Sequence, residues 1–144
     1  MNEVNATIAK FGYPKTVIKE YDHWVVMFRV TQVTVGSLVV AAKSSANSLG
    51  ELSSEVWSEF ATVSSELESW LAQAFEARKF NYLALMMKDP NVHFHVIPRY
   101  DFAVSIDGHS FVDPDWPLKT ELMETKMSDQ TKKVIMESIL RLAK

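Results

Sequence analysis

The sequence predicts an α+β domain built around a mostly antiparallel sheet. Three observations lead to this prediction: the apolar runs that resemble strands are short, only one segment has a long helical period, and the order is strands, long helix, hairpin and tail helix. A chain of 144 residues that is 47% hydrophobic, with no internal repeat and no long linker, is expected to form one domain over residues 1–144.

The first elements are a short helix and two strands. Residues 2–10 are expected to form the helix, which ends near Gly12 and Pro14. Residues 22–30, DHWVVMFRV, are rich in β-branched and aromatic side chains, as strands are. Residues 36–43, GSLVVAAK, form a second short apolar run and therefore a second predicted strand.

The longest periodic segment is residues 51–80, ELSSEVWSEFATVSSELESWLAQAFEARKF. Ser53 or Ser54 can cap its start, and Glu55 suits the positive end of a helix dipole. Apolar residues recur at steps of three and four, and this spacing places them on one stripe of a helix that should cover one face of the sheet. They are Val56, Phe60, Val63, Leu67, Trp70 and Ala74.

A hairpin and a tail complete the predicted elements. Residues 81–88, NYLALMMK, and 91–98, NVHFHVIP, are predicted to be adjacent strands joined by a very short Asp-Pro turn. Residues 102–144 form a tail region that is turn-rich at first and helical over the amphipathic residues 128–144. Within the turn-rich part, Trp116 is expected to anchor packing.

Side chains alternate across a strand, so the second strand of the hairpin has an apolar row and a polar row. The apolar row should pack against the long helix, while the polar row faces solvent or a cleft, and Pro98 should end the ladder. The apolar row is Val92, Phe94 and Val96, and the polar row is Asn91, His93 and His95.

Composition excludes several classes of function. With 15 Lys and Arg against 18 Asp and Glu, the net charge of −3 gives no broad attraction for nucleic acid or an anionic membrane. The absence of cysteine excludes thiolate catalysis and thiolate metal sites. No apolar run resembles a signal peptide or a membrane span, so we expect a cytoplasmic protein without a membrane partner.

Two imidazoles about 7 Å apart, twice the rise per residue of a strand, can act together on one phosphate-sized group. A neutral imidazole is a nucleophile at physiological pH, and a protonated one can stabilise charge in a transition state. Two other interpretations remain open for His93 and His95. They can be hydrogen-bonded surface histidines, or they can bind a metal with a third ligand. Candidates for that ligand are His23, His109, Asp89 and Asp101.

The residues NVHFHVIPRY, 91–100, resemble the signature of the histidine triad family, a row His-x-His-x-His followed by apolar residues and often Pro-Arg. The order of strands, long helix and hairpin resembles that family over residues 11–101, and DPDWP, 113–117, resembles a tail element of some bacterial members. The resemblance implies a five-stranded, mostly antiparallel sheet with one long helix packed on it, in addition to the helices predicted at the two ends. It also implies a homodimer.

The resemblance further implies an enzyme that hydrolyses or transfers nucleoside monophosphate groups from dinucleoside polyphosphates, such as diadenosine polyphosphates, or from related nucleotides. His93 is then the nucleophile that forms a nucleotidyl-histidine intermediate, and His95 contacts the α-phosphate. The protonated form of His95 would stabilise the transition state. The resemblance implies no cofactor and no metal ion.

Other positions follow the same resemblance. Asn91 occupies the place of the first histidine and can take part through hydrogen bonds, and Ser37 replaces the histidine of a Gly-His pair. Lys88 lies in a shortened phosphate loop, and Met27 and Arg29 match positions that line the nucleoside pocket. Two alternatives to this pocket role stay open: Met27 can be a core residue, and Arg29 can be a solvated surface charge. The missing histidines leave a second function open, a nucleotide-binding protein with weakened catalysis.

Overall fold

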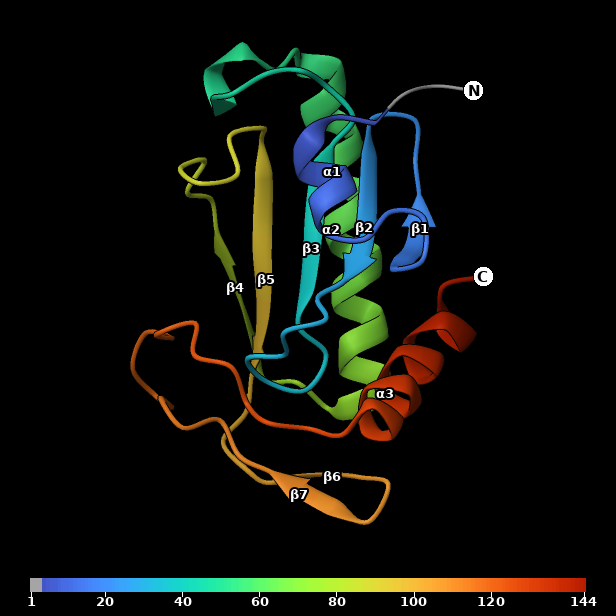
Figure 1. Ribbon diagram of the computed structural model, residues 1–144, viewed down its shortest axis with the longest axis vertical. Helices are drawn as coiled ribbons and strands as arrows, with labels where there is room; N and C mark the ends of the chain where they lie inside the picture. Colours follow the sequence, from blue (N-terminus) through green and yellow to red (C-terminus); the bar gives the residue numbers. More distant parts are fainter. Residues whose placement is uncertain (1–3) are drawn as a thin grey trace.

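The structure is a computed structural model, and it describes residues 4–144 (Figure 1). In chain order the elements are α1 (Ala6–Lys10), β1 (Val17–Glu20), β2 (Trp24–Phe28), β3 (Leu38–Ala42), the 3₁₀ turn η1 (Leu49–Glu51), α2 (Ser54–Phe75), β4 (Lys79–Leu83), β5 (His93–Arg99), β6 (Val104–Ile106), β7 (His109–Phe111) and α3 (Asp129–Leu142). The predicted N-terminal helix is present as α1. Residues 2 and 3 of that prediction lie outside the described residues.

Five strands form the main sheet, in the order β1-β2-β3-β5-β4, with every neighbouring pair antiparallel. The predicted α+β fold with a five-stranded antiparallel sheet is therefore confirmed. Figure 1 shows the short helix α1 on the near face of the sheet and the long helix α2 on the far face. The two faces thus have different covers, one small and one large.

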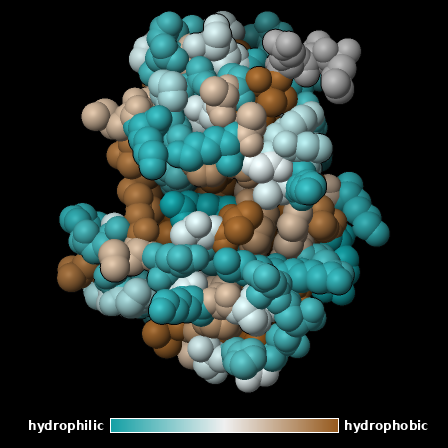
Figure 2. Space-filling view, viewed as in Figure 1, coloured by the Kyte–Doolittle hydropathy of each residue, from teal (hydrophilic) through white to brown (hydrophobic). Residues whose placement is uncertain are grey.

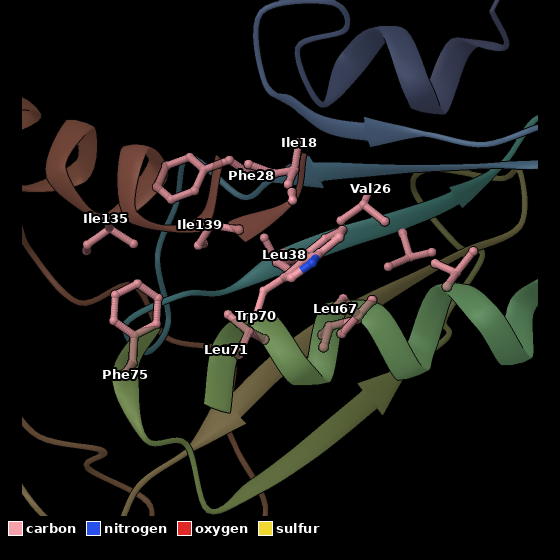
Figure 3. Close-up of a cluster of buried hydrophobic side chains, with 14 of the residues drawn as sticks. Ile18, Val26, Phe28, Leu38, Leu67, Trp70, Leu71, Phe75, Ile135 and Ile139 are labelled. Carbon is pink, nitrogen blue, oxygen red and sulfur yellow. The ribbon is translucent and has the colours of Figure 1, made fainter. Parts of the chain in front are cut away.

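Helix α2 starts and packs as its sequence predicts. The Ser53 side chain caps it by accepting a hydrogen bond from the backbone N–H of Val56, which would otherwise lack a partner within the helix. Burial of its apolar stripe against the sheet forms the main core, to which α3 adds two isoleucines (Figure 3). Buried members of this core include Val63, Leu67, Trp70, Leu71, Phe75, Val26, Leu38, Val96, Ile135 and Ile139.

The hairpin differs from its prediction in its first strand and its turn. Strand β4 begins at Lys79 and ends at Leu83, so residues 84–92 form the connection instead of a very short Asp-Pro turn. This connection reaches α1, where Lys10 Nζ lies 2.5 Å from Asp89 Oδ1. Because the tip of the loop contacts another element, local strand propensity does not extend β4 to residue 88.

Pro98 does not end the ladder, contrary to the prediction. It pairs with Phe80 of β4, and pairing continues to Lys79 and Arg99. Pairing of β5 with β3 already stops at Val96, so the missing N–H of Pro98 lies on the side without a ladder. The Pro98 carbonyl on that side accepts a hydrogen bond from Thr34 Oγ1 at 2.6 Å.

The tail contains more regular structure than its composition indicates. Strands β6 and β7 form a two-stranded hairpin whose turn residues Asp107 and Gly108 both have positive φ, 50° and 79°. An Asp-Gly pair favours this kind of tight turn. The predicted C-terminal helix is present as α3. None of the helices within residues 4–144 is long and apolar enough to cross a membrane.

Candidate active site

Strand β5 separates its two rows of side chains as predicted. Val92, Phe94 and Val96 pack in or against the core beneath α2. His93 and His95 point to the opposite face, which is the face that carries α1. They are more buried than the prediction of an outward row implies, because His93 is 2% exposed and His95 is 7% exposed.

The cover over the histidine row comes from the N-terminal segment. Ile8 of α1 is fully buried in a small apolar cluster on this face of the sheet. The Phe11 ring that follows the helix lies 5.6 Å from the His93 ring and 5.7 Å from the His95 ring, measured between centroids. Phe11 is thus a site residue that sequence reasoning missed, since no local pattern connects position 11 with position 93.

The tautomer of His93 is fixed by its neighbour. Its Nδ1 lies 2.8 Å from the backbone carbonyl oxygen of Asn91. A carbonyl oxygen only accepts hydrogen bonds, so Nδ1 must carry the proton and donate it. The lone pair of the neutral ring is then on Nε2, and this atom can act as a nucleophile.

His95 has the opposite tautomer. The guanidinium of Arg29 donates a hydrogen bond from Nε to Nδ1 of His95 at 3.3 Å. Nδ1 therefore carries the lone pair, and the proton of the neutral ring is on Nε2. Burial, and after it the positive charge of Arg29 and the neighbouring His93, together lower the pKa of His95 to about 4. At pH 7 this ring is neutral and is a hydrogen-bond donor through Nε2.

The two rings lie edge to face, with their centroids 5.1 Å apart. Among residues 4–144, no hydrogen bond uses the Nε2 of either ring. In the same part of the chain, no fully buried side-chain nitrogen or oxygen lacks a partner, so the Nε2 atom of each ring is not fully buried. The site therefore offers a nucleophilic nitrogen next to a hydrogen-bond donor. Figure 2 shows a hollow across the middle of this face, with hydrophilic surface at its floor.

Asn91 lies outside the histidine row, although the alternation of the sequence places it there. Strand β5 begins at His93, and the Asn91 side chain accepts hydrogen bonds from the N–H and Oγ1 of Thr7 at 3.4 and 3.2 Å. Its amide nitrogen donates to the Ser45 carbonyl and to Asn47 Oδ1. These contacts tie α1 to the entrance of β5. The backbone carbonyl of Asn91, and not its side chain, contacts His93.

Of the four residues predicted to bind a nucleotide, only Arg29 forms a hydrogen bond with the histidine row among residues 4–144. Met27 is fully buried in the apolar cluster beneath α1. Of the two placements that the sequence left open, the nucleoside pocket and the core, Met27 therefore has the core placement. Ser37 is also fully buried, and its hydroxyl holds the loop before β3 by bonding the backbone of Val33 and Thr34. Lys88 is exposed in the connection between β4 and β5.

The geometry does not supply the third ligand that a metal site would need. Within residues 4–144, no group of three or more His, Cys, Asp and Glu side chains is placed to hold a metal ion. His23 Nε2 lies 3.5 Å from Oε1 of Glu55 at the start of α2, and His109 lies in the β6–β7 hairpin. Neither is part of the histidine row.

Comparison with known proteins finds similarity in structure only. The sequence matches no family model and no curated protein. A histidine triad protein from Marinobacter aquaeolei superposes with a TM-score of 0.73 and 19% identity, covering 99% of this chain and 96% of that one. A histidine triad protein from Sinorhizobium meliloti gives a TM-score of 0.73 and 15% identity, with coverage of 96% and 95%.

A third similar structure is a hypothetical histidine triad nucleotide-binding protein from Sulfolobus tokodaii. Its TM-score is 0.67 and its identity 14%, with coverage of 89% of this chain and 83% of that one. The likeness extends over nearly the whole of the first two structures, including the tail beyond β5. From the sheet order, the placement of α2 and these three superpositions, we conclude that the chain has the histidine triad fold.

Proposed function

We propose that this protein is a nucleotide hydrolase or nucleotidyl transferase that attacks the α-phosphate of a dinucleoside polyphosphate or a related nucleotide. The observation that carries the proposal is the pair of opposite tautomers, with a lone pair on His93 Nε2 and a proton on His95 Nε2. The fold supports it, and the similar protein from Sulfolobus tokodaii is named as nucleotide-binding. The proposed substrate is an adenine dinucleotide such as diadenosine triphosphate.

In the first step, Nε2 of His93 attacks the α-phosphorus. A phosphorus–nitrogen bond forms, and the bond from phosphorus to the leaving phosphate breaks and gives its electron pair to the leaving oxygen. The imidazole that carries the nucleotidyl group is cationic. The Asn91 carbonyl, 2.8 Å from Nδ1, stabilises this charge by accepting the Nδ1 proton in a hydrogen bond.

In the second step, water attacks the same phosphorus, the phosphorus–nitrogen bond breaks, and the nucleoside monophosphate leaves. His93 recovers its lone pair, and the proton of the water passes to solvent. Through both steps the Nε2–H of His95 donates to a phosphoryl oxygen, and Arg29 supplies the positive charge that a neutral His95 does not. Arg29 thereby takes the role that the sequence had predicted for a protonated His95.

A second function has its own supporting observation. His93 is 2% exposed and lies beside the Phe11 ring, and this cover limits access to the attacking nitrogen. A protein that binds nucleotides with weak or no turnover would tolerate such a cover. We rank this function second because the tautomers of both imidazoles suit catalysis.

Turnover assays separate the two functions. We expect the wild-type protein to release AMP from diadenosine triphosphate and from adenosine phosphoramidate, with or without a chelator. His93→Gln should lower kcat by at least about a thousandfold, as loss of a nucleophile does. His109→Gln, at an exposed position of the β6–β7 hairpin, is the matched control and should keep wild-type turnover. Tight nucleotide binding without release of AMP would contradict the enzymatic function and support the nucleotide-binding function.

A further inference from the structure

A second cavity lies on the same face of the sheet as the histidine row, next to the tail. Its volume is about 150 Å³. Strands β4 and β5 contribute Lys79, Asn81 and Arg99, and the tail contributes Trp116, Leu118 and Lys119. The proposed chemistry at His93 does not use any of these residues.

Donors and positive charges dominate the polar part of this cavity. Arg99 donates from NH1 to Asn81 Oδ1 at 2.8 Å, and this bond fixes the orientation of the amide because only its oxygen accepts. The Nδ2 of Asn81 is thus left as a donor with no protein partner among residues 4–144. Lys79 is exposed and forms no ion pair within the same range. Lys119 is also exposed, and pairs with Glu121 at the surface.

The carboxylate that pairs with Arg99 is already neutralised. Asp113 accepts two hydrogen bonds from the guanidinium, at 2.6 and 3.1 Å, and the side chains of both residues are almost fully buried. Lys119 is paired with Glu121, so the groups at the cavity that remain unpaired within residues 4–144 are Lys79 and the Asn81 amide N–H, and both favour an anion. Trp116 and Leu118 add apolar surface, against which a ring can pack.

The strand register places this cavity close to the histidine row. Leu83 of β4 pairs with His95, and Asn81 pairs with Ile97. His95 and Ile97 are two residues apart on one face of β5, which corresponds to about 7 Å. A short polyphosphate chain can therefore extend from the histidine row to Asn81.

We propose that the cavity lined by Asn81, Lys79, Lys119 and Trp116 binds the phosphate-bearing leaving group of the substrate, with its phosphate on the donors and its base against Trp116. This inference rests on the proposed attack by His93. For diadenosine triphosphate, the group held here is ADP. Substrates with a small leaving group, such as adenosine phosphoramidate, do not reach the cavity.

The test is Asn81→Asp, which keeps the oxygen that accepts from Arg99 and replaces the free amide N–H donors by an anionic oxygen. We expect the ratio of kcat/KM for diadenosine triphosphate to kcat/KM for adenosine phosphoramidate to fall at least tenfold. Lys79→Gln should lower the same ratio by a smaller factor. Lys133→Gln, which removes an exposed charge on α3, is the matched control and should leave the ratio unchanged. An equal fall for both substrates in Asn81→Asp would overturn the inference.

Direct binding tests the cavity even if neither substrate is turned over. The probes are ADP and inorganic phosphate, followed by the NMR signal of the Trp116 indole N–H, which is assigned by its loss in Trp116→Phe. We expect ADP to shift the signal, at concentrations where inorganic phosphate does not, and Asn81→Asp to weaken ADP binding at least tenfold. A signal that ADP does not move would overturn the inference, as would equal affinity for both probes. Either result leaves the attack by His93 to be decided by its own assay.

Discussion

Arg29 Nε donates a hydrogen bond to His95 Nδ1 over 3.3 Å, and this contact joins the end of β2 to the middle of β5. It fixes the tautomer of His95 and holds a permanent positive charge beside a ring that is itself neutral. The proposed phosphate site thus combines an arginine charge with an imidazole N–H. Its charge does not depend on pH in the physiological range.

The first prediction concerns stability in acid. The pKa of His95 is about 4 in the folded protein and near 6.5 in the unfolded chain, so the unfolded chain binds more protons between these values. The free energy of unfolding should therefore fall as the pH is lowered from about 6.5 to about 4, with a contribution from His95 of about 2 kcal/mol. Urea unfolding across this range should show a shallower pH dependence for His95→Gln than for wild type. Identical slopes would contradict the assignment.

The second prediction concerns Arg29. Arg29→Met removes one of the charges that lower the pKa of His95, so that pKa should rise, while burial still holds it below its ordinary value. An NMR titration of the His95 ring protons measures the change directly. Arg78→Met is the matched control, since Arg78 pairs with Asp101 at the surface and should not affect His95. An unchanged pKa in Arg29→Met would show that the two side chains do not interact in solution.

The third prediction concerns Asn91. Because its side chain joins α1 to the entrance of β5 through Thr7 and Ser45, Asn91→Ala should lower the free energy of unfolding by about 1–2 kcal/mol. Asn91→His should also be destabilising. The Asn91 amide has one oxygen that accepts and two N–H groups that donate, and a neutral imidazole has only one N–H donor. A double-mutant cycle with Thr7→Val measures the coupling in urea unfolding. If the losses of unfolding free energy in the two single variants simply add, the side chains of Asn91 and Thr7 do not interact.

The fourth prediction concerns the pair of Arg99 and Asp113, whose side chains are 4% and 1% exposed. Asp113→Ala leaves the buried guanidinium without its carboxylate and should cost about 3–5 kcal/mol in unfolding free energy. Glu121→Ala breaks the exposed pair with Lys119 and should cost less than about 1 kcal/mol. Comparable losses in the two variants would argue against a buried pair.

Local patterns in the sequence predict the parts of the fold that depend on local physics. The period of three and four places Val63, Leu67 and Trp70 in the core, and Ser53 caps α2 as expected. Alternation along β5 correctly separates Phe94 from the histidines on the other face. These features depend on residues near one another in the chain, so the sequence determines them with little help from tertiary contacts.

The remaining features depend on contacts between distant residues. Phe11 covers the histidines, and Arg29 leaves the end of its strand to meet His95. Neither contact has a signal in spacing or composition. The long connection before β5 and the side-chain bonds of Asn91 depend likewise on α1, whose position on the sheet follows from burial of Ile8. The nucleoside-pocket role predicted for Arg29 remains a proposal.

The central claim is that His93 forms a covalent bond to the nucleotidyl group. The most direct measurement mixes the protein with diadenosine triphosphate, quenches in base within one turnover, and maps modified peptides by mass spectrometry. We predict one AMP group on His93 in the wild type, on the same residue in Asn81→Asp, and none in His93→Gln. An AMP group on another residue, or turnover without any adduct, would contradict the account.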